Sequence, residues 1–286
     1  MISSEDNEEN HSLKVCHENH FLETRKVSNH PHKYSYTTTW TTTGTVSLRS
    51  RICVFVLGPS AAGKTYLTFS KLPRVLHLNG LTLDSANFVS VDGGLMRDTS
   101  MVWKYTKSLP VQLGQIDKFS GLVGFKDLHS KYLKHDTRAF KNNLFHGLLQ
   151  QGCNMVIPDT AADYVTSLHV GSVGNKLKLL KKHGYTVVMT AVHASIRKCT
   201  ANGTSREKKE GKRYSSRAWS WTAKNVASLF NYSRSLGFKR AAYFIYDNTD
   251  WSNTKTVIVP PGMNVACDIL PHTTEQKIAK YTVHTW

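Results

Sequence analysis

The sequence predicts an α/β protein with a three-layer fold around a mainly parallel central sheet. Apolar, β-prone runs alternate along the chain with helical patterns, as expected of strand–helix–strand units. The first run leads directly into a glycine-rich loop. The chain has 286 residues, 40% of them hydrophobic and 10% aromatic, so we expect one large domain with a sizeable core.

The first strand is predicted at Ile52–Leu57, a continuous apolar run typical of a strand buried on both faces. Similar runs predict four more strands, at Asn87–Val91, Asn154–Ile157, Thr186–Val192 and Ala241–Tyr246. A last run, Thr254–Val259, precedes a Pro-Pro-Gly turn and predicts an edge strand.

Three helices are predicted between these strands. In the first, Phe140, Leu144 and Leu148 recur every four residues and therefore share one helical face. The second ends in basic residues before Gly184, as helices often do. The helices are predicted at Arg138–Gln151, Leu168–His183 and Ala218–Leu236.

Residues 1–50 differ from the rest of the chain. Ser3–Asn10 is acidic and polar, a histidine-rich basic stretch follows, and a threonine run occupies Thr37–Thr45. That run could be an exposed strand or a solvated tail. We expect a flexible N-terminal extension over residues 1–50, a domain over residues 51–265 and a C-terminal segment over residues 266–286.

The composition narrows the function classes. The 37 Lys and Arg against 20 Asp and Glu give a net charge of +17, which indicates an anionic partner. No stretch approaches the roughly 18 apolar residues of a membrane helix, so no membrane role is expected. The five cysteines form no CxxC pair, which predicts an intracellular, cytoplasmic protein without a zinc site or a disulfide framework.

The loop after the first strand fits the phosphate-binding pattern GxxxxGK[ST] at every fixed position. Its backbone N–H groups are expected to converge on phosphate oxygens at the start of a helix. Lys64 should reach the β- and γ-phosphates of ATP, and the Thr65 hydroxyl should bind Mg²⁺. The nucleotide-binding residues are Gly58, Pro59, Ser60, Ala61, Ala62, Gly63, Lys64 and Thr65.

Among P-loop proteins, the sequence favours a kinase. The Asn-Lys-x-Asp motif of GTPases is absent, and the strand at Asn154–Ile157 lacks the Asp-Glu ending of remodelling ATPases. A kinase needs an acid that accepts a proton from the acceptor hydroxyl, and mobile arginines at the transferred phosphoryl group.

Asp92 is the predicted acid. It follows the second strand, and ligands of parallel sheets bind beyond the carboxyl ends of the strands. A capping role for Asp92, at a helix starting near Leu95, is the alternative. Arg97 lies on that helix and is a candidate acceptor contact.

A lid is predicted after the fourth strand. The stretch before the helix at Ala218–Leu236 is rich in charged and small residues and is predicted to be a loop. It contains Arg206, Arg213 and Arg217, and such loops close over phosphates. Between residues 170 and 240 there are sixteen Lys or Arg and two acids, so most of the net charge falls here. This concentration of positive charge is compatible with a phosphate-handling lid and with a solvated basic face. It also makes nucleic acid a candidate partner.

These pieces together resemble the zeta-toxin-like P-loop kinases. The resemblance covers roughly residues 52 to 260 and rests on GPSAAGKT, VSVDGG, QQGCNMVIPDT, KKHGYTVVMTAVHASIRK and RYSSRAWSWTAKNV. It implies that Asp92 is the general base and that Arg206 and Arg213, or Arg217 in place of Arg213, stabilise the phosphoryl group. It also implies a small-molecule acceptor, UDP-N-acetylglucosamine in that family. An antitoxin holds such kinases in check, but no antitoxin-like partner can be inferred from this sequence.

The acceptor segment departs from the family pattern. Pro158 stands where the family has an acid, Asp159 follows, Thr160 matches the family threonine, and Ala161 and Ala162 replace Gly and Arg. Asp159 could serve the acceptor or the Mg²⁺ water shell. Two alternatives therefore stay open beside the small-molecule kinase: a polynucleotide 5′-hydroxyl kinase or RNA-repair module, and a non-catalytic ATP-binding protein.

Overall fold

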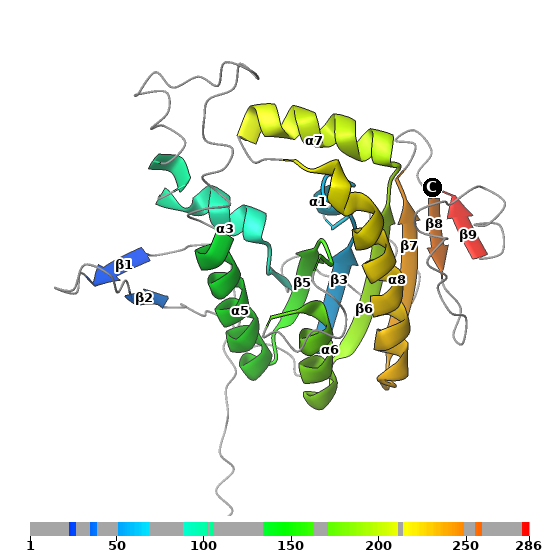
Figure 1. Ribbon diagram of the computed structural model, residues 1–286. Helices are drawn as coiled ribbons and strands as arrows, with labels where there is room; N and C mark the ends of the chain where they lie inside the picture. Colours follow the sequence, from blue (N-terminus) through cyan, green and yellow to red (C-terminus); the bar gives the residue numbers. More distant parts are fainter. Residues whose placement is uncertain are drawn as a thin grey trace, which may run out of the picture.

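The computed structural model describes residues 23–26, 35–38, 51–68, 88–101, 103–105, 134–162, 171–210, 214–248, 255–258 and 282–285. Its central feature is a seven-stranded sheet with the order β4-β5-β3-β6-β7-β8-β9 (Figure 1). The strands from β4 to β7 are parallel to their neighbours, and β8 and β9 are antiparallel. The predicted α/β fold with a mainly parallel sheet is confirmed.

All five predicted parallel strands are present. Their bounds are β3 (Ile52–Leu57), β4 (Phe88–Ser90), β5 (Asn154–Asp159), β6 (Thr186–His193) and β7 (Ala241–Asp247). Every residue of β3 is buried, as the continuous apolar run predicts. The pairing of Phe55 with Ile157 and with Met189 fixes the register of the three central strands.

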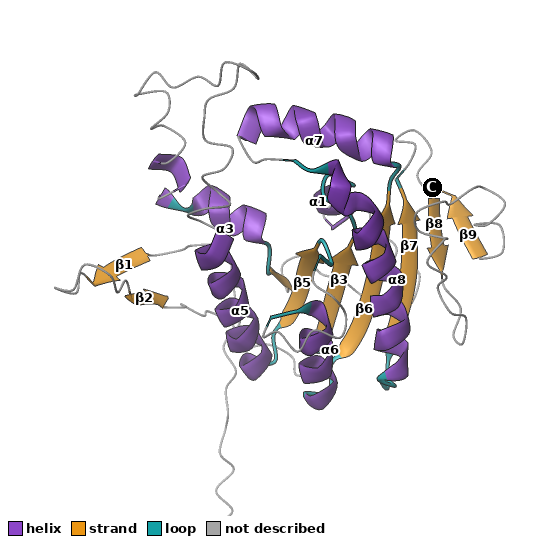
Figure 2. Ribbon diagram, in the orientation of Figure 1, coloured by secondary structure: helices purple, strands orange, loops and turns teal. Residues whose placement is uncertain are grey.

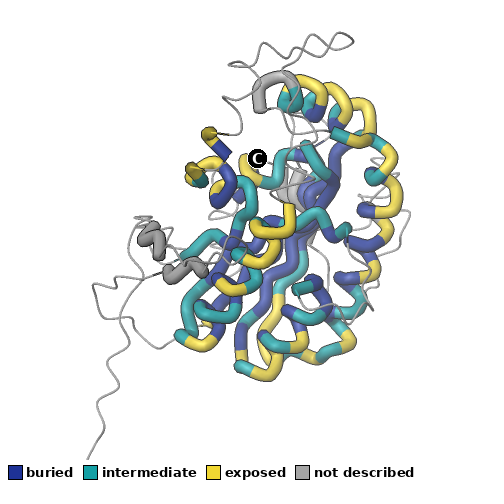
Figure 3. Tube along the Cα trace, turned by 60° about the vertical axis from the view of Figure 1, so that its left-hand side comes forward, coloured by how far each residue is buried: buried dark blue, intermediate teal, exposed yellow. Residues whose placement is uncertain are grey.

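Helices lie side by side over one face of the sheet (Figure 2). On one face the apolar sides of α5 (Lys134–Gln151), α6 (Val173–Lys182) and α8 (Trp219–Ser235) pack against Cys53, Phe55 and Leu57. On the other face, Val54 and Val56 pack with Leu67 and with Cys199 of α7 (Ile196–Glu210). Figure 3 shows the strands as the buried centre and the outward sides of the helices as the exposed surface.

Short elements complete the description. They are α1 (Lys64–Tyr66), α3 (Gly93–Thr99), the 3₁₀ turn η4 (Ser216–Ala218), β8 (Lys255–Ile258), β9 (Thr282–Thr285) and the antiparallel pair β1 (Glu23–Lys26) and β2 (Ser35–Thr38). The start of the threonine run, Thr37 and Thr38, lies in β2, and the rest of the run is outside the described residues. Within the described chain, no helix has the length and apolar character needed to cross a bilayer.

Two sequence predictions about elements are wrong. The segment after β6 is not a loop, because Ile196–Glu210 forms the helix α7, which lies across the carboxyl end of the sheet (Figure 1). The last predicted strand is not at the edge of the sheet, because β8 pairs with β7 on one side and with β9 on the other.

Candidate functional site

The P-loop joins the carboxyl end of β3 to α1, at the edge of the sheet that the motif predicts. A Cβ atom on Gly58 would lie 2.4 Å from the carbonyl oxygen of Val192, so only glycine fits beside β6. Gly63 adopts the left-handed conformation with φ 96°, and Ala61 adopts it with φ 65°. The loop is therefore closely packed and partly strained at its centre, as functional loops often are.

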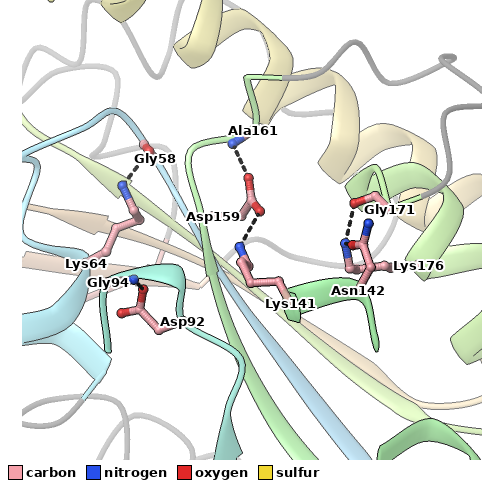
Figure 4. A network of polar contacts seen from close by, with 10 residues as sticks. All are labelled: Gly58, Lys64, Asp92, Gly94, Lys141, Asn142, Asp159, Ala161, Gly171 and Lys176. Atoms are coloured by element: carbon pink, nitrogen blue, oxygen red, sulfur yellow. Dashed lines mark hydrogen bonds and ion pairs between the residues drawn. The ribbon is translucent and has the colours of Figure 1, made fainter. Parts of the chain in front are cut away.

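Lys64 folds back over the loop that precedes it (Figure 4). Its Nζ donates to the carbonyl oxygens of Gly58 and Pro59, each at 2.8 Å. The ammonium group thus lies over the loop, on the side of the phosphate site.

Two asparagine amides contact the P-loop through its carbonyl groups. The side-chain amide of the buried Asn248 donates to the Ala62 carbonyl at 2.7 Å, and that of Asn202 on α7 donates to the Ala61 carbonyl at 3.3 Å. In a trans peptide the C=O and N–H groups point in opposite directions. Because Asn248 holds the Ala62 carbonyl, the N–H of Gly63 points the other way, away from Asn248.

Asn248 is itself fixed from two further sides. Its backbone N–H donates to the His193 carbonyl at 2.7 Å, and its carbonyl accepts from Lys198 Nζ. Its side-chain oxygen is buried and has no partner among the described residues. No local pattern in the sequence indicates that Asn248 contacts the P-loop.

Asp92 lies where β4 ends and α3 begins. Its Oδ1 accepts a hydrogen bond from the Gly94 N–H at 2.7 Å, and Asp92 is the N-cap of α3. The capping alternative is therefore correct as geometry, although the helix starts at Gly93 rather than near Leu95. No contact to Oδ2 is found among the described residues, so one carboxylate oxygen caps the helix and the other is available for chemistry.

Asp159 lies between Asp92 and the P-loop in the sheet order, because β5 separates β4 from β3. Its carbonyl accepts from the Gly58 N–H at 3.2 Å, which ties the end of β5 to the start of the P-loop. Its carboxylate pairs with Lys141 of α5 at 3.2 Å and accepts from the Ala161 N–H at 3.0 Å (Figure 4).

Opposing effects act on the ionisation of Asp159. Burial alone would raise the pKa of its carboxyl, but the charges of Lys141 and Lys176 and the Ala161 hydrogen bond hold the pKa below its ordinary value. Asp159 is thus an anion held by an internal cation. The sequence did not indicate Lys141, which lies 18 residues away on another element.

The segment after Asp159 is also held in an unusual conformation. Ala161 has φ 53°, in the left-handed region that favours glycine, and its carbonyl accepts from the buried Asn225 amide at 3.0 Å. Thr160, between Asp159 and Ala161, is half-buried. Pro158 lies inside β5, and Asp159 is the last residue of that strand. Asp159, rather than Pro158, is therefore the residue at the carboxyl edge of the sheet.

Arg97 is only 3% exposed. Its guanidinium contacts Asp98 at 3.2 Å and lies over the Trp103 ring at 5.3 Å. Arg97, the predicted acceptor contact, is therefore buried and already paired within the α3 region.

The predicted lid arginines lie in different elements. Arg206 is half-buried in α7, not in a loop; Arg217 is exposed in η4; and Arg213 is outside the described residues. Helix α7 and η4 are adjacent, because Tyr214 packs on Gly203 and its N–H donates to Glu207 at 3.3 Å. Trp219 is buried and donates to the Ala194 carbonyl, whereas Trp221 is 48% exposed.

Within the described part of the chain, no three His, Cys, Asp or Glu side chains gather as a metal site. A P-loop needs no such cluster, since one hydroxyl and the nucleotide phosphates supply most of the ligands to Mg²⁺. Thr65 is exposed at the start of α1, and hydroxyl and carboxylate oxygens are the ligands that Mg²⁺ prefers. The residues at the site therefore fit this ion.

Comparison with solved structures identifies the fold. A chain from the PezAT chromosomal toxin–antitoxin system of Streptococcus pneumoniae has a TM-score of 0.50 and 14% identity, covering 81% of this chain and 83% of that one. The two chains share a fold. The α/β fold with a mainly parallel central sheet, expected from the sequence, is thus also the fold of this chain of the PezAT system.

A chain of the AvrRxo1-ORF1:-ORF2 complex with ATP has a TM-score of 0.45 and 17% identity, covering 74% of this chain and 58% of that one. The same complex with sulphate ions gives a TM-score of 0.46 and 15% identity, covering 73% and 58%. No protein-family model matches the sequence, and no curated protein matches it.

Proposed function

We propose that the chain is an ATP-dependent kinase that transfers the γ-phosphoryl group to a hydroxyl of a small molecule. One observation carries the proposal: the P-loop with Lys64 and the Asp92 carboxylate follow strands of one parallel sheet, at the same carboxyl edge (Figure 4). A phosphate cradle and a base at one edge are what in-line transfer to a hydroxyl needs.

On this proposal the P-loop holds the β- and γ-phosphates through backbone N–H groups, and Thr65 holds Mg²⁺. Bound Mg²⁺ offsets the negative charge on the phosphates. Lys64 exchanges the carbonyls of Gly58 and Pro59 for phosphate oxygens when ATP binds. The ammonium group is a cationic donor in both sets of contacts, but a phosphate oxygen also carries negative charge, so the exchange replaces contacts to neutral carbonyls with contacts to an anion.

The transfer step then belongs to Asp92. The acceptor hydroxyl attacks the γ-phosphorus, the bond from that phosphorus to the β–γ bridging oxygen breaks, and Asp92 accepts the hydroxyl proton. The products are ADP and the phosphorylated acceptor. Arg206 and Arg213 are proposed to contact the transferred group from the α7 side, with Arg217 as the alternative to Arg213.

The acceptor is proposed to lie along the segment from Asp159 to Thr160; Arg97, which is buried against Asp98 and Trp103, would support this side of the site from within the α3 region. A UDP-sugar such as UDP-N-acetylglucosamine is the proposed acceptor, on the strength of the sequence resemblance. Asp159 is already paired with Lys141, so it would meet an acceptor as one member of an ion pair rather than as an isolated anion.

The decisive experiment supplies γ-labelled ATP and Mg²⁺ with UDP-sugars, nucleosides and 5′-hydroxyl oligonucleotides. Wild type, Asp92→Asn and Lys64→Ala are compared, and ATP binding is measured in parallel. Label on a UDP-sugar that both variants lose supports the proposal. Label on an oligonucleotide replaces it with a polynucleotide kinase, and ATP binding without transfer to any acceptor replaces it with a non-catalytic nucleotide-binding protein.

A further inference from the structure

The cations of the basic region between residues 170 and 240 do not all lie near the P-loop. Six exposed cations lie together where the strands begin, at the edge of the sheet opposite the P-loop. This amino-edge patch consists of Arg51, Lys178, Lys181, Lys182, Lys239 and Arg240. Figure 1 shows the ends of α6 and α8 at this edge and α7 at the other.

The backbone brings these residues together. Arg51 and Arg240 directly precede β3 and β7, and their carbonyls accept hydrogen bonds from β6. The Thr186 N–H donates to the Arg51 carbonyl at 2.8 Å, and the Val187 N–H donates to the Arg240 carbonyl at 3.2 Å. Three adjacent strands therefore begin side by side here.

The end of α6 joins the same edge. The guanidinium of Arg51 donates to the carbonyl of His183 at 3.1 Å, directly after α6. Lys181 Nζ donates to the Gly237 carbonyl and lies 5.8 Å from the centre of the Phe238 ring. Lys178 and Lys182 are one helical turn apart on the exposed side of α6.

The acids are at the other edge. Every acidic side chain that the structure describes follows a strand or lies on a helix at the carboxyl end of the sheet: Asp92, Asp98, Asp136, Asp159, Glu207 and Asp247. None of these six acids therefore neutralises the amino-edge patch. Like charges held this close repel one another, since surface charges interact over about 8–10 Å at physiological salt.

The chemistry of the patch limits its partner. Among the described residues, the exposed large apolar side chains are Tyr66, Leu95, Met101, Tyr105, Ile196 and Trp221, which lie in, or directly after, elements at the carboxyl end of the sheet. Phe238 lies at the patch, but its ring is half-buried against Lys181. Among the described residues, the amino-edge patch therefore presents no exposed apolar anchor for a bilayer or a protein and no exposed ring for base stacking. It offers charge alone, which matches a regular array of phosphates.

We propose that the amino-edge patch binds the sugar–phosphate backbone of a nucleic acid, independently of sequence, with the P-loop facing away from it. The binding adds to the proposed kinase function and does not depend on it. On this proposal, part of the positive charge of the chain serves nucleic-acid binding at one edge of the sheet, and the P-loop serves phosphate chemistry at the opposite edge.

The test measures binding of a fluorescein-labelled 20-nucleotide RNA by anisotropy between 50 and 300 mM NaCl. With six phosphate contacts, log affinity should fall against log salt with a slope of about −4 for a single strand. The variant Lys178→Ala/Lys182→Ala/Lys239→Ala should bind at least about tenfold more weakly and reduce the slope by about 2.

A matched variant controls for net charge. Lys104→Ala/Lys134→Ala/Lys224→Ala removes three exposed lysines from elements outside the patch, and it should keep the wild-type slope and lose less than about threefold in affinity. Equal losses in both variants would overturn the proposal, as would no binding by wild type at 100 mM NaCl. Equally tight binding of poly-glutamate, or tighter binding of phosphatidylserine vesicles, would replace the nucleic acid with another polyanion. ATP affinity, measured beside these, should be the same in all three proteins whatever the RNA result.

Discussion

Asp92 caps α3 with one carboxylate oxygen and is proposed to accept a proton with the other. Substitution by asparagine separates these roles, because asparagine caps helices about as well as aspartate but cannot act as the base. We expect Asp92→Asn to lower the transfer rate by roughly 10²–10⁴ while ATP affinity and thermal stability stay near wild type.

Asp92→Ala is the control for capping. It removes the cap as well as the base and should lose about 1 kcal/mol of stability in addition to activity. Rates come from labelled-ATP transfer, and stabilities from thermal denaturation. A fully active Asp92→Asn protein would show that another group accepts the proton.

Asn248 is expected to affect nucleotide binding through the P-loop it contacts. Asn248→Ala removes the hydrogen bond that orients the Ala62 peptide, and it also removes a buried oxygen that lacks a partner, so these two effects on stability oppose each other. We expect ATP affinity to fall about tenfold, equivalent to about 1.4 kcal/mol, with a small change in melting temperature.

Asn225→Ala is the matched variant, because Asn225 is also a buried amide that donates to an alanine carbonyl, that of Ala161. It should lower the melting temperature and leave ATP affinity unchanged. Calorimetric titration with ATP distinguishes the two, and equal ATP affinities in wild type and Asn248→Ala would show that the contact does not orient the loop.

At the scale of elements, the packing of α7 depends on a glycine. A Cβ atom on Gly203 would lie 2.3 Å from the ring of Tyr214, so Gly203→Ala must displace this ring or move α7 away from the segment before α8. We expect Gly203→Ala to lower the free energy of unfolding by about 1–3 kcal/mol.

In α5, a Cβ on Gly147 would meet nothing within 4 Å, so Gly147→Ala should instead raise the free energy of unfolding by roughly 0.5–1 kcal/mol. Urea denaturation measures both, and effects of the same sign would contradict this packing.

The contact between α5 and β5 predicts a pH dependence. The pKa of Asp159 is lowered in the folded protein, so its pairing stabilises the fold above its unfolded pKa of about 4 and stops doing so as the pH falls through the folded value. Lys141→Met removes the direct partner of a mostly buried carboxylate. We expect a loss of about 1–2 kcal/mol at pH 7 that shrinks below pH 4.

The control for this prediction is Lys134→Met, on the same helix but exposed, which should change stability by less than about 0.5 kcal/mol. Urea denaturation at pH 7 and pH 3.5 provides the comparison. A loss that is equal at both pH values would mean that Lys141 acts through packing alone.

Elements with a strong local pattern were predictable from the sequence. Five parallel strands and the P-loop were predicted because their residues carry the signal themselves. Helix α7 was missed because Ile196–Glu210 is polar and buries few residues, among them Cys199 and Gly203, so its periodicity is weak. The Lys141–Asp159 pair and the Asn248 contact join elements far apart in sequence, and no local pattern reports such contacts.

At the scale of the whole molecule, the sheet ends in a strand close to the C-terminus. Val257 of β8 is in register with Val283 of β9, so β9 pairs along the outer side of β8. Val283→Pro removes an N–H from the ladder and should uncouple β9, because proline is poorly tolerated within strands. Val283→Thr keeps a strand-forming residue and serves as the control.

An uncovered strand edge pairs readily with other chains. We therefore expect Val283→Pro to form soluble oligomers or aggregates, detected by light scattering, while Val283→Thr remains like wild type. A monodisperse Val283→Pro protein would show that β8 does not need β9 as a cover.

The pairing of β9 has a practical consequence for preparing the protein. A version shortened to end at residue 265 would keep the P-loop, Asp92 and Asp159 but would lack β9 entirely. Such a protein could lose solubility for reasons unrelated to catalysis, and its inactivity would then be mistaken for a missing catalytic residue. Affinity tags and truncations are therefore better placed at the N-terminal side, where, among the described strands, β1 and β2 pair with each other and not with the main sheet.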